Sequence, residues 1–121
     1  YIDDIPGEKL EMFSFETLYG FLMQVLYNPT DKTIEMACIY GATNIFKYLI
    51  SLNIKPTNMC VFIATSYNSL YILMTLVSMN INPTNMDLMQ PCIKGHFGIV
   101  KYLISLGLTF SNSLLHLKFK H

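Results

Sequence analysis

The side chains in this sequence that most often serve catalysis or metal binding are three cysteines and three histidines. Cys38, Cys60 and Cys92 are widely separated, and their spacing matches neither a C-x-x-C metal motif nor a framework of disulfides. We therefore expect reduced thiols. His116 and His121 are five positions apart, whereas two zinc-binding histidines on one helical face are separated by four. These residues predict no metal site and no cofactor.

Acidic side chains gather near the start of the chain, at Asp3, Asp4, Glu8, Glu11 and Glu16. Two of them could form a general-acid pair, but a solvated face of a terminal helix accounts for the cluster more simply. The glycines form neither of the G-x-x-x-x-G-K-[ST] and G-x-G-x-x-G patterns that hold phosphates. No nucleophile has a base at a suitable spacing, so we expect that the protein is not an enzyme and has no small-molecule substrate.

The composition narrows the class of protein further. The 121 residues suffice for one domain, and only 13% of them are charged, with a net charge of zero. Because no cluster of bases is present, we expect no binding to nucleic acid. An apolar fraction of 52% excludes a disordered chain. Since the first residue is Tyr1, we expect the sequence to be a segment of a longer protein.

The most apolar region, residues 56–86, contains no charged side chain. A transmembrane helix needs about 20 consecutive apolar residues. Three asparagines and Pro83 interrupt the region and leave Leu70–Met79 as its longest apolar run. We therefore expect no membrane span, and with no signal peptide recognisable at the start we expect an intracellular, cytoplasmic protein.

An internal repeat is the strongest pattern in the sequence. The pentapeptide Y-L-I-S-L at Tyr48–Leu52 returns at Tyr102–Leu106, and half of that offset places residues 76–85 on 49–58 without a gap. One unit cannot bury its own apolar residues, so the units must stack as a solenoid, forming one domain over residues 1–121. The 27-residue period gives units 5–31, 32–58, 59–85 and 86–112, and a partial unit 113–121.

Each unit is predicted to form two short helices. In the second unit, apolar or small residues recur at helical spacing at positions 34, 37, 38 and 41, and again at 45, 46, 49 and 50. We expect Asn44 to cap the second helix, which ends near Asn53. The unit closes with P-T-N at residues 56–58, where Asn58 is expected to cap the next first helix. The matching cap positions are Asp31, Asn85 and Asn112.

Pro91 falls inside the first helix predicted for the fourth unit. A proline in a helix interior costs about 3 kcal/mol, but one in the first turn is tolerated. We therefore expect an irregular segment between Met86 and Lys94, with the helix starting near Gln90.

Residues 92–107, C-I-K-G-H-F-G-I-V-K-Y-L-I-S-L-G, resemble the core of the ankyrin repeat, A-A-x-x-G-H-x-x-V-V-x-L-L-L-x-x-G. Ala37–Gly41 and Ile45–Leu49 are similar to the same pattern. Met86–Met89 replaces the usual T-P-L-H opening, Asn68-Ser69 replaces Gly-His, and the period is 27 rather than about 33. The chain thus resembles the short, divergent ankyrin-repeat units expanded in protozoan parasites and large DNA viruses.

The resemblance implies an all-α, ankyrin-like helix-turn-helix solenoid without β-turn fingers, in which His96 is structural. It also implies a non-catalytic scaffold for protein–protein interaction, because ankyrin-like proteins bind partners through a concave face to which the first helices contribute. The partner is an unidentified protein. The candidate partner-binding residues are apolar side chains of the first helices that are expected to face outward or toward neighbouring units: Met36, Tyr40, Ile63, Tyr67 and Ile93.

Several alternatives remain open at this point. The candidate residues could instead pack between successive first helices or against further repeats. The chain could be a structural spacer within a longer repeat array, or a substrate adaptor for a ubiquitin-ligase-type machinery. A leucine-rich repeat fits Leu49, Leu52 and Ile54, although its asparagine is expected where Thr57 stands. The helical spacing of both apolar stripes favours paired helices.

Overall fold

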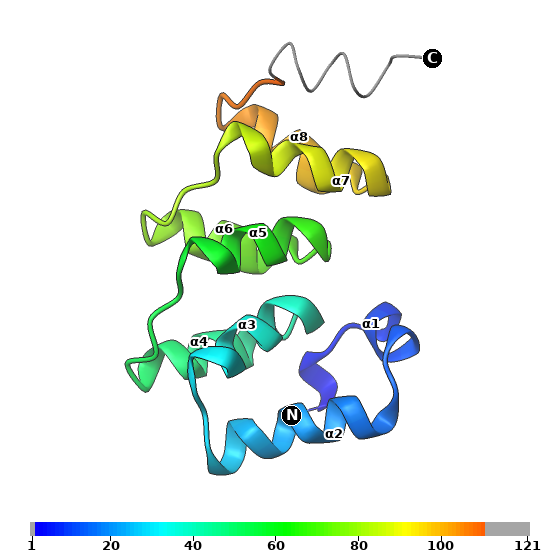
Figure 1. Cartoon of the computed structure of the whole chain (residues 1–121), viewed down its shortest axis with the longest axis vertical. Helices are drawn as coiled ribbons and strands as arrows, with labels where there is room; N and C mark the ends of the chain where they lie inside the picture. The colour runs from blue at the N-terminus through cyan, green and yellow to red at the C-terminus, as the bar shows by residue number, and fades with distance from the viewer. Residues whose placement is uncertain (1, 111–121) are drawn as a thin grey trace.

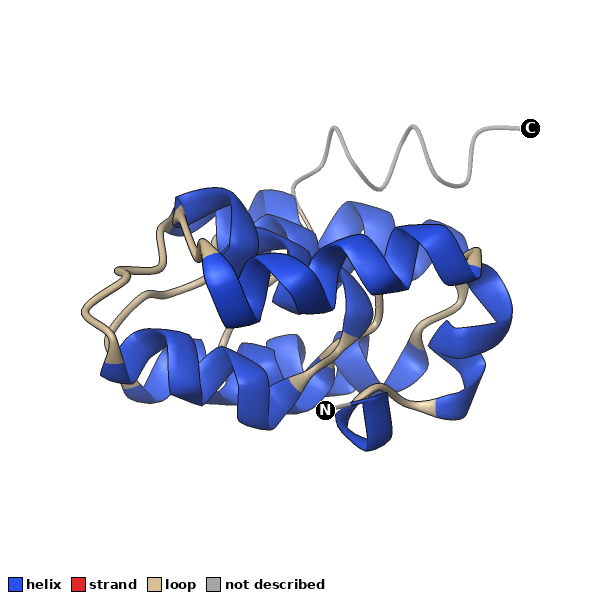
Figure 2. Cartoon of the chain, turned by 90° about the horizontal axis from the view of Figure 1, so that it is seen from below, coloured by secondary structure: helices blue, strands red, loops and turns tan. Residues whose placement is uncertain are grey.

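The computed structural model describes residues 2–110, and within this range the chain forms helices and no strand, which confirms the predicted all-α class. Loops and turns connect the helices (Figure 2). The part of the chain before Asp31, called the first unit from here on, contains the 3₁₀ turn η1 (Ile2–Asp4) and helices α1 (Gly7–Met12) and α2 (Phe15–Tyr27). Three helix pairs follow: α3 (Asp31–Tyr40) with α4 (Thr43–Ser51), α5 (Asn58–Ser66) with α6 (Leu70–Ser78), and α7 (Met89–Lys94) with α8 (Phe97–Ser105), where η2 (Asn85–Leu88) precedes α7.

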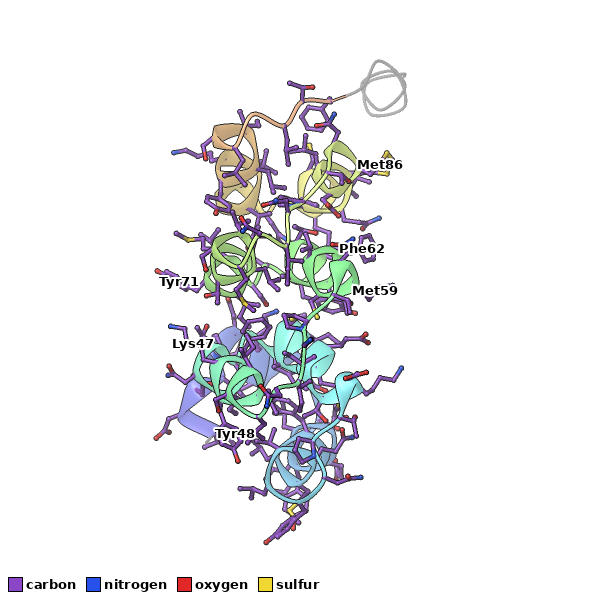
Figure 3. All side chains as sticks on the ribbon, turned by 90° about the vertical axis from the view of Figure 1, so that its left-hand side faces the viewer. Lys47, Tyr48, Met59, Phe62, Tyr71 and Met86 are labelled. Atoms are coloured by element: carbon purple, nitrogen blue, oxygen red, sulfur yellow. The ribbon has the colours of Figure 1, made fainter. Side chains whose placement is uncertain are left out.

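The three helix pairs are layers that lie one above the other (Figure 1). Their second helices begin at Thr43, Leu70 and Phe97, which are spaced by exactly one repeat period each, and the three helices have the same length. First helices form one column and second helices the other (Figure 3). Contacts join α3 to α5, α5 to α7, and α4 to α6. One period of the sequence therefore corresponds to one layer of two helices.

The core lies between the two columns and continues from layer to layer. In the α3–α4 layer, Ile34 and Ala37 are buried from the first helix and Phe46 and Leu49 from the second. The next layers repeat this arrangement with Val61, Ala64, Ile72, Leu73 and Leu76, and then with Leu88, Ile99 and Leu103. Each fully buried Leu, Ile or Phe contributes about 1.5–3 kcal/mol. Because neighbouring layers share this core, the stack stabilises each of its members.

The first helices are capped by threonine, one residue earlier than predicted. Thr30 and Thr57 are N-caps whose hydroxyl oxygens accept a backbone N–H of the first turn at 3.2 Å, and Thr84 is the N-cap of η2. The prediction of caps at Asp31, Asn58 and Asn85 is therefore wrong, since these residues are the first residues of their helices. Threonine is itself a good cap, and its extended backbone here is the conformation that an N-cap normally adopts. The predicted cap Asn112 lies outside the described residues.

The second helix α4 is also capped differently from the prediction. Its N-cap residue is Ala42, which has no side-chain acceptor, so Asn44 lies inside the helix. The missing acceptor comes from the first unit, where the Asp4 carboxylate accepts the backbone N–H groups of Asn44 at 3.1 Å and Ile45 at 2.8 Å. A cap so distant in the chain could not be predicted from the local sequence of α4.

Left-handed residues end the helices, and they explain one departure from the ankyrin pattern. Gly41 and Gly95 have φ of 67° and 75°, and Asn68 occupies the matching position with φ 61°. Asparagine is the residue that replaces glycine most readily in this conformation. The Asn68-Ser69 turn thus has the backbone of the Gly turns. Asn53, with φ 67°, follows the C-cap Leu52 of α4, so this helix ends near the predicted residue.

The irregularity predicted around Pro91 is confirmed. Residues 85–88 form the 3₁₀ turn η2, and the α-helix begins only at Met89. Pro91 is buried in the first turn of α7, where its missing N–H leaves no helical hydrogen bond unmade. The first helix of this layer is therefore shorter than α3 and α5.

The first unit does not pack like the layers. Its longest helix, α2, lies below α3 and buries Leu18, Phe21 and Val25 (Figure 1). The short helix α1 turns away to one end of the stack. Among residues 2–110, no helix has both the length and the hydropathy needed to cross a bilayer.

Candidate functional site

The first unit reaches the edge of the stack at which each first helix turns into its second helix. We call this the turn edge; it comprises Gly41-Ala42, Asn68-Ser69 and Gly95-His96. Helix α1 lies beside it at the ends of the lower layers (Figure 1). The polar groups of three elements, α1, α5 and α7, meet there.

Lys9 is the residue of α1 that makes hydrogen bonds beside the turn edge. It is only 2% exposed, and its ammonium group donates hydrogen bonds to the carbonyls of Ile39, at 2.7 Å, and Tyr67. These carbonyls lie at the C-terminal ends of α3 and α5, where a helix carries a partial negative charge and free acceptors. Burial lowers the pKa of Lys9 to about 8, while Glu8 raises it and Lys94 lowers it. Lys9 therefore joins two layers through one buried ammonium group.

The ring of Tyr67 has two lysines close to it. The Nζ atom of Lys9 is 5.5 Å from the ring centroid and that of Lys94 is 5.1 Å from it, both within the range of a cation–π interaction. Lys94 also donates a hydrogen bond to the Ser66 carbonyl at 3.0 Å. The hydrogen-bond acceptors of both ammonium groups are therefore neutral carbonyls.

Two buried polar atoms at the turn edge have no hydrogen-bond partner within the described chain: the Ser66 hydroxyl oxygen and the Nδ1 atom of His96. Ser66 is 5% exposed. Burial lowers the pKa of His96, while the Thr65 carbonyl raises it and nearby Lys94 lowers it. A neutral imidazole follows, which can donate or accept at Nδ1 according to its tautomer.

These groups surround a pocket of about 290 Å³, which we call the turn-edge pocket. Its residues are Glu8, Lys9, Met12, Ser66, Tyr67, Asn68, Lys94 and His96. Its lining combines two lysines and one glutamate with a larger share of apolar surface. No group of three metal-ligating side chains occurs in residues 2–110.

The predicted partner-binding residues have different environments. Tyr40 is 4% exposed, and its ring lies 4.8 Å from that of Phe13 and 4.9 Å from that of Phe21. The first unit therefore covers Tyr40, which removes it from the surface that a partner could reach. Met36 and Ile63 are half-buried against the core, Tyr67 lines the turn-edge pocket, and Ile93 is exposed.

A second exposed surface lies on the column of first helices. Met59, Phe62 and Met86 point away from the stack on the same side, and they are 53%, 46% and 62% exposed (Figure 3). We call these three residues the apolar row. Lys47, Tyr48 and Tyr71 of the second helices point to the opposite side. Met59 and Met86 were not predicted as surface residues from the sequence, although they occupy matching positions in successive units.

The cysteines are buried or half-buried. Cys38 and Cys60, in adjacent first helices, interact through their side chains, which lowers the pKa of Cys60 to about 7 and raises that of Cys38, where burial acts in the same direction. This contact between neighbouring layers was not predicted, because the repeat register matches Cys38 with Cys92 and not with Cys60. Both thiols are closed to solvent, so they are poorly placed for chemistry on a substrate.

The acidic cluster is divided between two roles. Asp4 caps α4, and Glu8 borders the turn-edge pocket. Asp3, Glu11 and Glu16 are exposed to solvent. This distribution agrees with a solvated face and a cap.

Comparisons of the chain with protein-family models, with curated proteins and with solved structures find no match. The resemblance to ankyrin repeats rests on the repeat residues of 32–112 quoted above.

Proposed function

We propose that the protein is a non-catalytic scaffold for protein–protein interaction, built as a solenoid of ankyrin-like repeats. The observation that supports this function best is the apolar row: three large side chains from adjacent layers that face solvent on one side of the first helices. Single exposed apolar residues are common on protein surfaces. A group that gathers on one side of successive layers is instead typical of a surface that another protein covers.

The energetics of the apolar row suit this role. Burial of a large apolar side chain by a partner contributes about 1.5–3 kcal/mol, and a few such residues dominate the affinity of most interfaces. The shared core of the layers holds the backbone of α5 rigidly, so little entropy is lost when a partner docks on Met59 and Phe62. Ile93 on α7 would extend the contact.

Affinity capture with the full chain tests this function. The variant Phe62→Ser with Met86→Ser removes most of the apolar row, and Tyr71→Ser with Met74→Ser makes a matched change on the exposed side of the second helices. We expect the first variant to lose partners that the wild type and the second variant retain. Because all four residues are exposed, melting temperatures should agree within about 4 °C. Equal retention of every partner by both variants would contradict the proposal.

A further inference from the structure

Helix α2 is apolar on more than one side, although it lies at the base of the stack (Figure 1). Its buried residues Leu18, Phe21 and Val25 form the face that packs under α3. The remaining faces of a surface helix normally have charged or polar residues. In the 13 residues of α2, however, Glu16 is the single charged side chain. This composition is typical of a helix that is covered by a second neighbour.

The second apolar face is formed by Phe15, Tyr19, Leu22 and Leu26, which we call the α2 seam. These residues are separated by four, three and four positions, the spacing of the a and d positions of a coiled coil. Phe15, Tyr19 and Leu26 are 70%, 52% and 46% exposed, and Leu22 is half-buried. The rings of Phe15 and Tyr19 stack with centroids 6.0 Å apart. They are thus already ordered, so little entropy is lost when a partner covers them.

The spacing of the α2 seam is the same in both directions along the helix. If a second copy of α2 lies antiparallel, Phe15 faces the other copy's Leu26, and Tyr19 faces its Leu22. The symmetry of the pair then repeats both contacts. A two-fold symmetric dimer needs a surface that is complementary to itself. The α2 seam meets this condition by matching each aromatic side chain with an aliphatic one.

The charge on α2 also favours an antiparallel pair. In a parallel pair the two Glu16 carboxylates would lie side by side and repel each other. In the antiparallel pair they are about 13 Å apart along the helix axis, because each residue of a helix rises 1.5 Å. This separation exceeds the screening length of about 8 Å in physiological salt. A net charge of zero for the whole chain adds no further repulsion.

The area of the α2 seam determines how strong such a dimer is. A buried aromatic side chain accounts for about 150–250 Å², and Phe15 and Tyr19 each leave more than half of their surface exposed. With Leu26 and the flanking side chains of Glu16 and Met23, one copy supplies about 500 Å². The total of about 1,000 Å² is at the small end of specific interfaces. A dissociation constant in the micromolar range follows.

We propose that two copies of the protein form a dimer through their α2 seams, with the helices antiparallel. The apolar row lies on α5 and η2, separate from this interface, so a dimer presents two apolar rows. A partner with two binding segments would gain avidity from that arrangement. The dimer itself needs no partner, so its test is independent of the capture experiment.

Sedimentation velocity of the full chain, from about 1 μM to about 300 μM, tests the dimer, since this range includes the expected dissociation constant. Tyr19→Glu places two carboxylates on either side of the symmetry axis and should raise the dissociation constant at least about tenfold. Tyr71→Glu makes the same change at an exposed position of α6 and should leave it within about twofold. Both tyrosines are exposed, so circular dichroism should show equal helix content in all three proteins.

A mixing experiment distinguishes a second copy from any other occupant of the α2 seam. Tyr19→Lys should be as weak a dimer as Tyr19→Glu, because like charges meet in each. An equimolar mixture of the two variants should associate at least about tenfold more tightly than either alone, because opposite charges then meet. The proposal is overturned by a wild type that stays monomeric over the whole range, by a Tyr19→Glu dimer as tight as the wild type, by equal loss in Tyr71→Glu, or by a mixture no tighter than its components.

Discussion

The first unit and the layers that follow it have similar lengths in sequence and different roles in the structure. Each layer pairs a first helix with a short second helix. In the second helices α4, α6 and α8, the side chain of the N-cap residue makes no capping hydrogen bond. The first unit instead contains the 13-residue α2 and supplies polar groups to its neighbours. Asp4 caps α4, and Lys9 serves the ends of α3 and α5. The first unit thus supplies charged groups to the helix ends of the two layers next to it.

The largest expected effect tests whether the first unit and the layers form one cooperative core. Phe21 of α2 and Phe46 of α4 are both fully buried. Phe21→Ala and Phe46→Ala should each lower the free energy of unfolding by about 3–5 kcal/mol, because each leaves a cavity. Phe15→Ala, at an exposed position of α2, should change it by less than about 0.5 kcal/mol. Urea denaturation measures all three; a Phe21→Ala effect as small as that of Phe15→Ala would show that the first unit unfolds separately.

The next effect concerns the buried ammonium group of Lys9 and its dependence on pH. Since the pKa of Lys9 is about 8 in the folded protein and near 10.5 when exposed, the unfolded chain binds more protons between these values. Stability due to Lys9 therefore rises as pH increases through this window, and it is constant below it. The free-energy difference between wild type and Lys9→Met should shift in favour of wild type by about 1–3 kcal/mol from pH 7 to pH 10.5.

Denaturation of both proteins at several pH values measures the Lys9 effect, and Lys101→Met provides a control at an exposed lysine. Glu8 and Lys94 are the charged groups that act on Lys9, and both are retained in each protein, as is the ring of Tyr67. If the curves for wild type and Lys9→Met remain parallel across the window, the ammonium group is not desolvated.

A smaller effect isolates the cap that the first unit gives to α4. Asp4→Ala removes the acceptor of the Asn44 and Ile45 N–H groups and should cost about 1 kcal/mol. Asp3→Ala removes the neighbouring exposed carboxylate and should cost almost nothing. Chemical denaturation compares the two, and equal losses would mean that α4 needs no acceptor from the first unit.

The smallest effect concerns the turn between α5 and α6, where Asn68 replaces the glycine of the other layers. If Asn68 fills the glycine position of the turn, Asn68→Gly should change stability by less than about 0.5 kcal/mol, whereas Asn68→Ala should cost about 1 kcal/mol because φ is 61°. Thermal unfolding distinguishes the two variants. A large loss in Asn68→Gly would indicate a role for the amide beyond the backbone conformation.

The layers could be predicted from the sequence because their determinants are local. The apolar spacing around Ile34 and Ile45 returns in each later unit, and Pro91 restricts its own helix wherever the chain is placed. The threonine caps were missed by one residue because Thr57 and Asn58 are both good capping types. Choosing between them requires the backbone angles of the loop.

The turn-edge pocket could not be predicted, because it depends on where a non-repeating unit packs. Nothing in the period places Lys9 beside Tyr67, which is far from it in the chain. The same packing covers Tyr40, which the sequence offered as a candidate partner-binding residue. Lys94 could have been noticed as the cation that takes the tyrosine position in the fourth unit.

The loops between layers have the same sequence pattern, so one layer could be removed without changing the junction between its neighbours. Pro56-Thr57-Asn58 and Pro83-Thr84-Asn85 are alike, so excision of residues 58–84 would rejoin the chain at an equivalent junction. Helix α7 would then follow α3 and α4 directly, and residue 94 would take the place of residue 67 in the register. The Lys94 backbone carbonyl would then accept from the Lys9 ammonium group as the Tyr67 carbonyl does, while the tyrosine ring beside that ammonium group would be lost. Removal of one layer would therefore keep the buried hydrogen bond of Lys9 and remove its cation–π contact.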